Sequence, residues 1–252
     1  MIKRMLLLLL LLGVIAYLAL AITWFSRPAQ GLECRNLVLV VKDTARSSFV
    51  SKEELKALLT QKDLYPVGRP LKQVQTALIE EELRKHPMAD KVECYVSSGG
   101  DVCIAVTQRN PILRVFTASG DTYYVDEKGG IMPATGKNSV YVPVATGMIE
   151  KGFAEKELYR FALFLQENPF WNAQIEQIYV RPGQNIELVP RVGNHLVYIG
   201  KLQQVEQKLE RLKKFYQKGL NQVGWDKYSY INVEFGNQII CTKRESADNR
   251  SL

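Results

Sequence analysis

The chain has 252 residues, enough for one large domain or two ordinary ones, and it has the composition of a globular protein. Hydrophobic residues make up 46% of it and charged residues 23%, which excludes general disorder. The formal net charge of +7 is concentrated at the two ends: residues 1–27 carry +3, residues 28–189 carry −1 and residues 190–252 carry +5. This distribution argues against a nucleic-acid-binding surface that runs along the whole chain.

The amino terminus predicts a membrane span. Residues 5–25 contain no charge, and at about 1.5 Å per residue they form about 31 Å of helix, which matches a hydrocarbon core of about 30 Å. Lys3 and Arg4 precede the span, so the positive-inside rule places residues 1–4 in the cytoplasm. A cleaved signal peptide is the alternative, because Ala19-Leu20-Ala21 resembles a cleavage site, but the apolar run continues to Phe25. Both interpretations place the chain from about residue 28 outside the cytoplasmic membrane.

Four cysteines follow the predicted span, at positions 34, 94, 103 and 241, and none forms a C-x-x-C motif. A zinc site of that type is therefore not indicated. Cys94 and Cys103 flank the predicted hairpin turn Ser98-Gly99-Gly100-Asp101. They share a sheet face if the loop has two or four residues and lie on opposite faces if it has three. We expect free or facultative thiols.

A short polar linker, residues 26–35, leads into a small α+β domain that we assign to residues 36–108. Its first strand is the β-branched run 37–41, and Ser51 with Glu54 forms a capping box that opens a helix. A second helix is predicted from about residue 71 to 85, where Pro87 prevents its continuation. The alternating segments 92–96 and 102–106 then form a hairpin. The predicted order is β-α-α-β-β.

A second domain, dominated by β-structure, is predicted over residues 109–243, with a polar tail at 244–252. Helices are expected at 153–166 and 202–218; the latter carries an apolar stripe at helical spacing. The expected strands are 112–116, 122–125, 129–131, 175–180, 186–189, 196–199, 228–235 and 238–242, the last two joined by Gly236-Asn237. The predicted fold class is therefore α+β: a transmembrane helix, a small domain and a mixed β-sheet with flanking helices.

The sequence shows no catalytic motif. The only histidines, His86 and His195, are 109 residues apart, and no nucleophile elbow, Walker A, H-E-x-x-H or G-x-G-x-x-G pattern occurs. The run Glu80-Glu81-Glu82 fits a solvated helix face, because consecutive helical residues point about 100° apart. We predict no catalytic residue, no metal and no cofactor. A membrane-anchored enzyme that acts on peptidoglycan is the alternative function.

The basic excess near the carboxyl end lies on one flank of the last predicted helix, where Arg211, Lys214 and Lys218 follow its apolar stripe. An ordinary solvated face is the simplest interpretation. The functional alternatives are a surface for a protein partner or for anionic lipid.

Several short motifs follow one another along the chain, and their order and spacing are informative together. They are Ser51-x-x-Glu54-Leu55, His86-Pro87, Gln108-Arg109-Asn110-Pro111-Ile112, Tyr124-Val125-Asp126-x-x-Gly129, Tyr141-Val142-Pro143-Val144-x-x-Gly147, Leu209-x-x-Leu212 and Tyr230-Ile231-Asn232-Val233-Glu234-Phe235. Through these motifs the chain resembles the FtsQ/DivIB family of bacterial cell-division proteins over nearly its whole length. Gln108 departs from the pattern, because many members have Glu there, and the amino-terminal tail is shorter than in many members.

This resemblance implies a POTRA domain at 36–108 followed by a β domain, with Arg109 and Pro111 at the junction between them. It implies a non-enzymatic scaffold of the division septum in the inner membrane, with the bulk of the chain in the periplasm. The implied partners are FtsB and FtsL, two small coiled-coil membrane proteins that influence septal peptidoglycan synthesis, and other divisome components through the POTRA domain.

The resemblance also places the partner surface on the last helix and the strands that end the β domain. The matching positions are Arg211, Phe215, Tyr230, Ile231, Asn232, Val233, Glu234 and Phe235. An independent physical argument supports this location, because a final strand tends to leave unpaired N–H and C=O groups to which a partner strand can bind. The alternative for Ile231 and Phe235 is that their side chains pack in the core.

Overall fold

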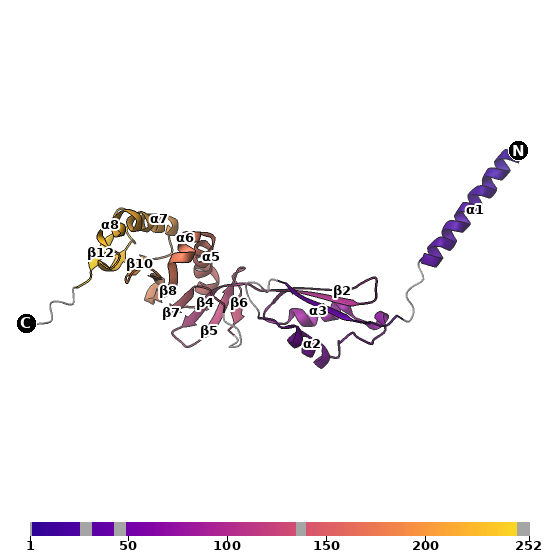
Figure 1. Ribbon diagram of the computed structural model, residues 1–252, viewed down its shortest axis with the longest axis horizontal. Helices are drawn as coiled ribbons and strands as arrows, with labels where there is room; N and C mark the ends of the chain where they lie inside the picture. The colour runs from indigo at the N-terminus through magenta and orange to yellow at the C-terminus, as the bar shows by residue number, and fades with distance from the viewer. Residues whose placement is uncertain (1, 26–31, 43–48, 135–139, 246–252) are drawn as a thin grey trace, which may run out of the picture. The chain divides into compact units, whose positions relative to one another are not determined.

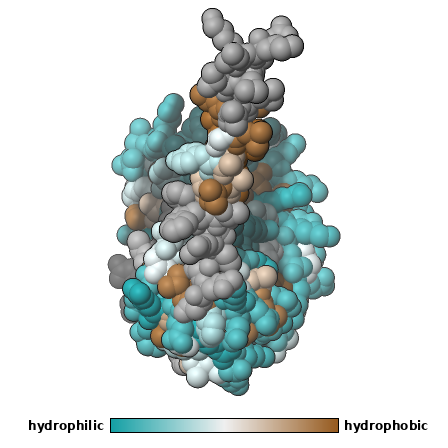
Figure 2. Space-filling view, turned by 90° about the vertical axis from the view of Figure 1, so that its right-hand side faces the viewer, coloured by the Kyte–Doolittle hydropathy of each residue, from teal (hydrophilic) through white to brown (hydrophobic). Residues whose placement is uncertain are grey.

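The structure, a computed structural model, describes residues 2–25, 32–42, 49–134 and 140–245, with only the backbone of residues 2–9 and 23–25 (Figure 1). It begins with helix α1 (Ile2–Phe25). The described side chains of α1 are almost all exposed, and Figure 2 shows apolar residues of this helix at the surface. In the described part of the chain, no helix is both long enough and apolar enough to cross a membrane. Lys3, Arg4 and residues 5–9 and 23–25 of the predicted span lie outside the side chains that are described.

The chain divides into two compact units. The first consists of Met1–Val40, Lys52–Leu83 and Val92–Ala105, and the second of Val41–Ser51, Arg84–Lys91 and Val106–Leu252.

A three-stranded sheet with the strand order β1-β3-β2 and two helices form the amino-terminal α+β fold, in the predicted order β-α-α-β-β. Leucine and isoleucine residues at helical spacing, among them Leu55, Leu59, Ile79 and Leu83, form the buried sides of the helices. The elements are β1 (Leu37–Lys42), α2 (Lys52–Gln61), η1 (Leu71–Gln73), α3 (Thr76–Arg84), β2 (Ala89–Val96) and β3 (Val102–Gln108).

The structure corrects the predicted start of the second helix in this fold. Residues 71–73 form a single 3₁₀ turn, and α3 begins only at Thr76. The interruption lies at the β-branched Val74, whose extended backbone, with φ −73° and ψ 112°, separates the two segments.

The β2–β3 loop places Cys94 and Cys103 on opposite faces of the sheet. Ser97 N–H donates to the carbonyl of Asp101, so three residues lie between the opposed positions and Cys103 lies opposite Tyr95. Cys94 is accordingly buried, whereas Cys103 is half-buried. All four cysteines are free thiols.

The second unit is built on a mixed sheet in which nine described strands have the order β12-β11-β10-β9-β8-β7-β4-β5-β6. The pairs β4–β7, β7–β8 and β10–β11 are parallel and the others antiparallel. The strands are β4 (Pro111–Thr117), β5 (Thr122–Asp126), β6 (Ile131–Pro133), β7 (Val144–Gly147), β8 (Ile175–Arg181), β9 (Asn185–Pro190), β10 (Leu196–Gly200), β11 (Tyr228–Asn232) and β12 (Ile240–Lys243).

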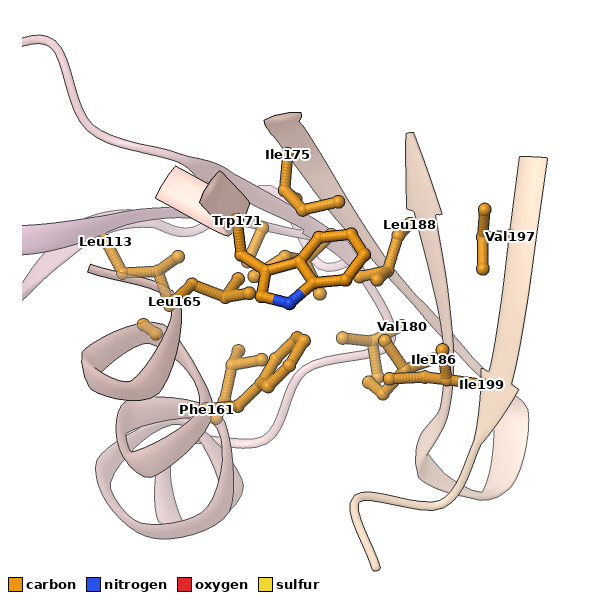
Figure 3. Packing of buried hydrophobic residues seen from close by; sticks show 14 of the residues in the cluster. Leu113, Phe161, Leu165, Trp171, Ile175, Val180, Ile186, Leu188, Val197 and Ile199 are labelled. Carbon is orange, nitrogen blue, oxygen red and sulfur yellow. The ribbon is translucent and has the colours of Figure 1, made fainter. Parts of the chain in front are cut away.

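Helices cover one face of this sheet and enclose a hydrophobic core. Trp171 lies between the helical residues Phe161 and Leu165 and the strand residues Val180 and Leu188 (Figure 3). The helical segments are α4 (Lys151–Phe153), the π-helical η2 (Ala154–Leu158), α5 (Tyr159–Glu167), α6 (Pro169–Gln174), the 3₁₀ turn η3 (Pro182–Gln184), α7 (Val205–Phe215), the π-helical η4 (Tyr216–Leu220) and α8 (Asn221–Val223).

Two helical predictions need correction in this unit. Helix α7 begins at Val205 rather than at residue 202, because Gln204 has a left-handed backbone with φ 52° and separates Leu202 from the helix. Helix α6 was not predicted, although its sequence contains a start signal: the Asn168 side chain accepts hydrogen bonds from Phe170 N and Trp171 N, and Pro169 occupies the first turn.

Candidate partner-binding site

Strand β12 forms one edge of the nine-stranded sheet. It pairs on one side with β11, with Ile240 opposite Asn232 and Thr242 opposite Tyr230. Strand β11 is paired on both sides, because it also lies parallel to β10. Among the strands that the structure describes, the open edge therefore belongs to β12, and the backbone of residues 228–232 is already used within the sheet.

The hydrogen-bond pattern shows which backbone groups of β12 point outward. Val233 N–H donates to the carbonyl of Tyr198, so the odd-numbered residues of β11 turn their backbone groups toward β10 and the even-numbered ones toward β12. Ile240 and Thr242, which lie opposite even-numbered residues, therefore bond to β11. Cys241, between them, directs its N–H and C=O toward the open edge.

The side chains around this edge form a mixed apolar and basic surface. Ile240 is 46% exposed and Phe235, in the loop before β12, is 43% exposed. Thr242 and Lys243 are exposed as well. Cys241 packs against the core, and burial raises the pKa of its thiol. We call Phe235 together with β12 the edge site.

Arg211 attaches the loop of the edge site to helix α7. Its guanidinium donates hydrogen bonds to the carbonyl oxygens of Val233, at 3.0 Å, and of Phe235, at 2.9 Å. Two charge-assisted bonds from one side chain hold the turn that carries Phe235 against the helix. Arg211 is thus part of the fold of this loop, whereas Lys214 on α7 and Lys218 on the following segment η4 are exposed.

Two of the predicted partner-contacting side chains are in the core. Ile231 and Val233 are completely buried. The expected strand 228–235 ends at Asn232, so Val233, Glu234 and Phe235 lie in the loop. For Ile231 the structure thus shows the alternative, packing in the core, whereas Phe235 is exposed. Val233 and Phe235 do not continue the strand as expected, because the chain turns away from the sheet after Val233 N–H has bonded to Tyr198.

The remaining predicted residues make contacts within the fold next to the edge site. Phe215 packs against Tyr228, with the ring centroids 6.1 Å apart. Tyr230 donates its hydroxyl proton to the buried Glu187 at 2.9 Å, and its pKa rises to about 12 through burial, with Glu187 as the next cause. The Asn232 side chain accepts a hydrogen bond from Glu234 N at 2.9 Å.

Lys208 is a structural residue that the sequence did not reveal. Its side chain is 7% exposed, and its ammonium group donates hydrogen bonds to the carbonyl oxygens of Ile199, at 2.8 Å, and Lys201, at 2.9 Å. Burial lowers its pKa. The periodicity of α7 does place position 208 beside the apolar stripe, but only the tertiary structure brings the end of β10 to it.

Arg109 and Pro111 lie at the start of the sheet. Arg109 Nε donates to the Asp126 carboxylate at 2.7 Å, and only 4% of the Asp126 side chain is exposed. The same carboxylate accepts from Lys128 N and Gly130 N, so it also shapes the β5–β6 turn. Pro111 is the first residue of β4.

Gln108, the position that departs from the family pattern, has a buried side chain that hydrogen-bonds to the backbone of a distant segment. Its side-chain oxygen accepts hydrogen bonds from Phe49 N and Val50 N, both at 2.9 Å. A neutral amide suits this position, because it accepts these bonds without burying a charge.

The two histidines take part in structural hydrogen bonds. His195 is 3% exposed, and its Nε2 lies 2.8 Å from the hydroxyl of Tyr216. His86 Nδ1 accepts a hydrogen bond from Met88 N. Over the residues that the structure describes, no group of three or more His, Cys, Asp or Glu side chains is arranged to hold a metal ion.

A small α+β domain followed by a mixed sheet with an open edge is an architecture suited to protein–protein contacts. The family model described as FtsQ/DivIB, C-terminal related, matches residues 110–242, and the model of the POTRA-like domain matches residues 32–107. The chain belongs to the FtsQ/DivIB family, whose domains imply a role in cell division. No curated protein matches it.

Proposed function

We propose that this protein is a non-enzymatic scaffold of the division machinery that recruits FtsB and FtsL to the septum and thereby helps control septal peptidoglycan synthesis. The observation that carries the proposal is the edge site, where a single sheet offers outward backbone groups beside two exposed apolar side chains. A partner segment adds to β12 as a further strand.

The edge site has the features that strand addition requires. The outward N–H and C=O of Cys241 supply main-chain hydrogen bonds, which give affinity without reading a partner's sequence. Ile240 and Phe235 flank them with apolar surface, which provides side-chain contacts. Arg211 holds the Phe235 turn in place before a partner arrives, which reduces the ordering cost of binding.

We further propose that residues 5–25 anchor the protein in the inner membrane, with Lys3 and Arg4 in the cytoplasm and the rest of the chain in the periplasm. In this scheme residues 26–35 are a linker, 36–108 the POTRA domain, 109–243 the β domain and 244–252 a tail. Other divisome components bind the POTRA domain. The uncharged run at 5–25 and the family membership support this arrangement.

The test removes one outward N–H group. Cys241→Pro eliminates the N–H that faces the open edge while it leaves the pairing of Ile240 and Thr242 with β11 intact. Loss of one hydrogen bond of about 0.5–1.5 kcal/mol is expected to weaken FtsB binding about 2- to 13-fold. Cys241→Val is the matched control, since it changes the side chain but keeps the N–H. Both full-length variants are compared in a pull-down with FtsB and FtsL.

Equal capture by the Pro and Val variants would refute strand addition at β12. Phe235→Ala tests the side-chain contact separately and is expected to reduce capture. A proline at position 233 is unsuitable, because Val233 N–H donates to Tyr198 within the sheet. Normal division after depletion of the protein would contradict the scaffold role itself.

A further inference from the structure

A second surface lies on the flank of α7 that faces α5, away from Arg211. Two adjoining cavities, of about 360 and 430 Å³, form a groove between α5 and the first turns of α7. They share Phe164, Glu206 and Gln207 in their walls, so they are parts of one groove. We call it the helix groove.

The floor of the helix groove is apolar. Phe161 is 3% exposed and extends from α5 toward the sheet (Figure 3), which closes the bottom of the groove. Phe164, Leu202 and Val205 are half-buried and line it from both sides. Trp171 lines the second cavity and is only 2% exposed. Such a floor has room for a few apolar side chains of a ligand.

The rim of the helix groove is acidic. Glu157 from η2 and Glu206 and Glu210 from α7 line it, against the single cation Arg160. Glu210 also lies 3.8 Å from Lys214, but both side chains are more than half exposed, so this pair neutralises the rim weakly. The rim is therefore negative in a protein whose formal net charge is +7.

We infer that the helix groove binds a basic amphipathic helix of a partner protein, at a site separate from the edge site. An apolar floor between two helices fits the apolar face of a third helix, whose residues at i, i+3 and i+4 enter the groove. Lys or Arg residues beside that apolar face then meet Glu157 and Glu206. A second copy of this chain, docked groove to groove, is a poor occupant, because the two acidic rims would repel each other.

The experiment measures binding of a fluorescein-labelled amphipathic peptide made of Leu, Ala and Lys to the full-length protein in phosphatidylcholine nanodiscs, with empty nanodiscs subtracted. A peptide with Glu in place of each Lys is the charge control. We expect the Lys peptide to bind and the Glu peptide to bind at least about fivefold more weakly.

Charge reversal locates the site. Glu206→Lys is expected to weaken binding of the Lys peptide about fivefold or more. Glu176→Lys is the matched control, because it changes the net charge equally at an exposed position that lines neither cavity. Leu202→Ala is expected to weaken binding as well, whereas Leu196→Ala, at an exposed position on β10, is not.

Two results would overturn the inference. In the first, Glu206→Lys and Glu176→Lys have the same effect, or the Glu peptide binds as well as the Lys peptide. In the second, the protein self-associates and Glu206→Lys abolishes this, which would make a second copy the occupant. Capture of FtsB by Glu206→Lys is expected to remain normal, so failure here and failure of strand addition at β12 are distinguishable.

Discussion

Replacement of Lys208 by Met gives a sharp test of how α7 is attached to the sheet. The ammonium group of Lys208 donates to two main-chain carbonyls, those of Ile199 and Lys201, in a place where the side chain is 7% exposed. Met has nearly the same length as the Lys stem and fills the same space. The substitution therefore removes the two hydrogen bonds with little loss of packing.

The expected cost follows from those two bonds. A hydrogen bond from a charged group contributes about 1.5–3 kcal/mol to stability. Part of this loss is offset in Lys208→Met, because the variant has no ammonium group that must be desolvated on folding. Because the buried Ile199 carbonyl and the partly buried Lys201 carbonyl both lose their donor, we expect the free energy of unfolding to fall by about 2–4 kcal/mol. With a urea m-value of about 3 kcal/mol/M, the unfolding midpoint falls by about 1 M.

Urea unfolding of the full-length protein, followed by the fluorescence of Trp171 and Trp225, measures this change. Both indoles report on the core under α7, since Trp171 and Trp225 contact Tyr216. Lys218→Met, at an exposed position on the following turn, is the control and is expected to unfold like the wild type. If Lys208→Met is as stable as the wild type, the carbonyls are satisfied without the lysine and the argument is wrong.

Two further predictions concern a glycine and a histidine. Gly147 has φ +110°, and a Cβ there would overlap the Val180 carbonyl oxygen, so Gly147→Ala is expected to destabilise the fold by more than about 2 kcal/mol in thermal unfolding. Gly152→Ala in α4, where a Cβ meets open space, is expected to stabilise it by about 0.5–1 kcal/mol. Burial lowers the pKa of His195 below its ordinary 6.5, an effect that Arg244 reinforces and Asp226 opposes. Between the lowered pKa and 6.5 the unfolded chain binds a proton that the native state does not, so stability is expected to decrease as pH falls through this window. His195→Phe is expected to flatten this pH dependence of the unfolding midpoint, and an unchanged slope would contradict the assignment.

Local signals in the sequence predicted most elements of the fold. The hairpin of β2 and β3 was predicted from alternating apolar and polar residues on both sides of Gly99-Gly100. The strands β8, β9 and β10 were predicted from short apolar runs between turns. Helix α6 and strand β7 were missed, and the other errors lie at element ends, such as the start of α7 at Val205, where the left-handed backbone of Gln204 is not encoded by periodicity. Element boundaries depend on single residues, whereas element type depends on many.

The candidate site was predicted only in outline. The sequence indicated the last helix and the last strands, but it left open whether Ile231 contacts a partner or packs in the core and counted Val233 among the partner contacts, whereas the structure buries both. The alternation of a strand shows which residues share a face but not which face the helices cover. The alternation also does not show which strand lies at the edge of the sheet. The strand order in the structure shows that β12, and not β11, is the edge strand.

The sequence by itself determined the uncharged amino-terminal run, the two-domain order, the absence of catalytic motifs and the family resemblance, because composition and local spacing are sufficient for these. Only the tertiary structure decided that Cys241 has outward backbone groups, that Arg211 holds the Phe235 turn and that Lys208 binds the end of β10. These features join residues that lie tens of positions apart in the chain or depend on the strand order of the sheet. Local periodicity contains no information about either, and the packing of the helices on the sheet supplies it.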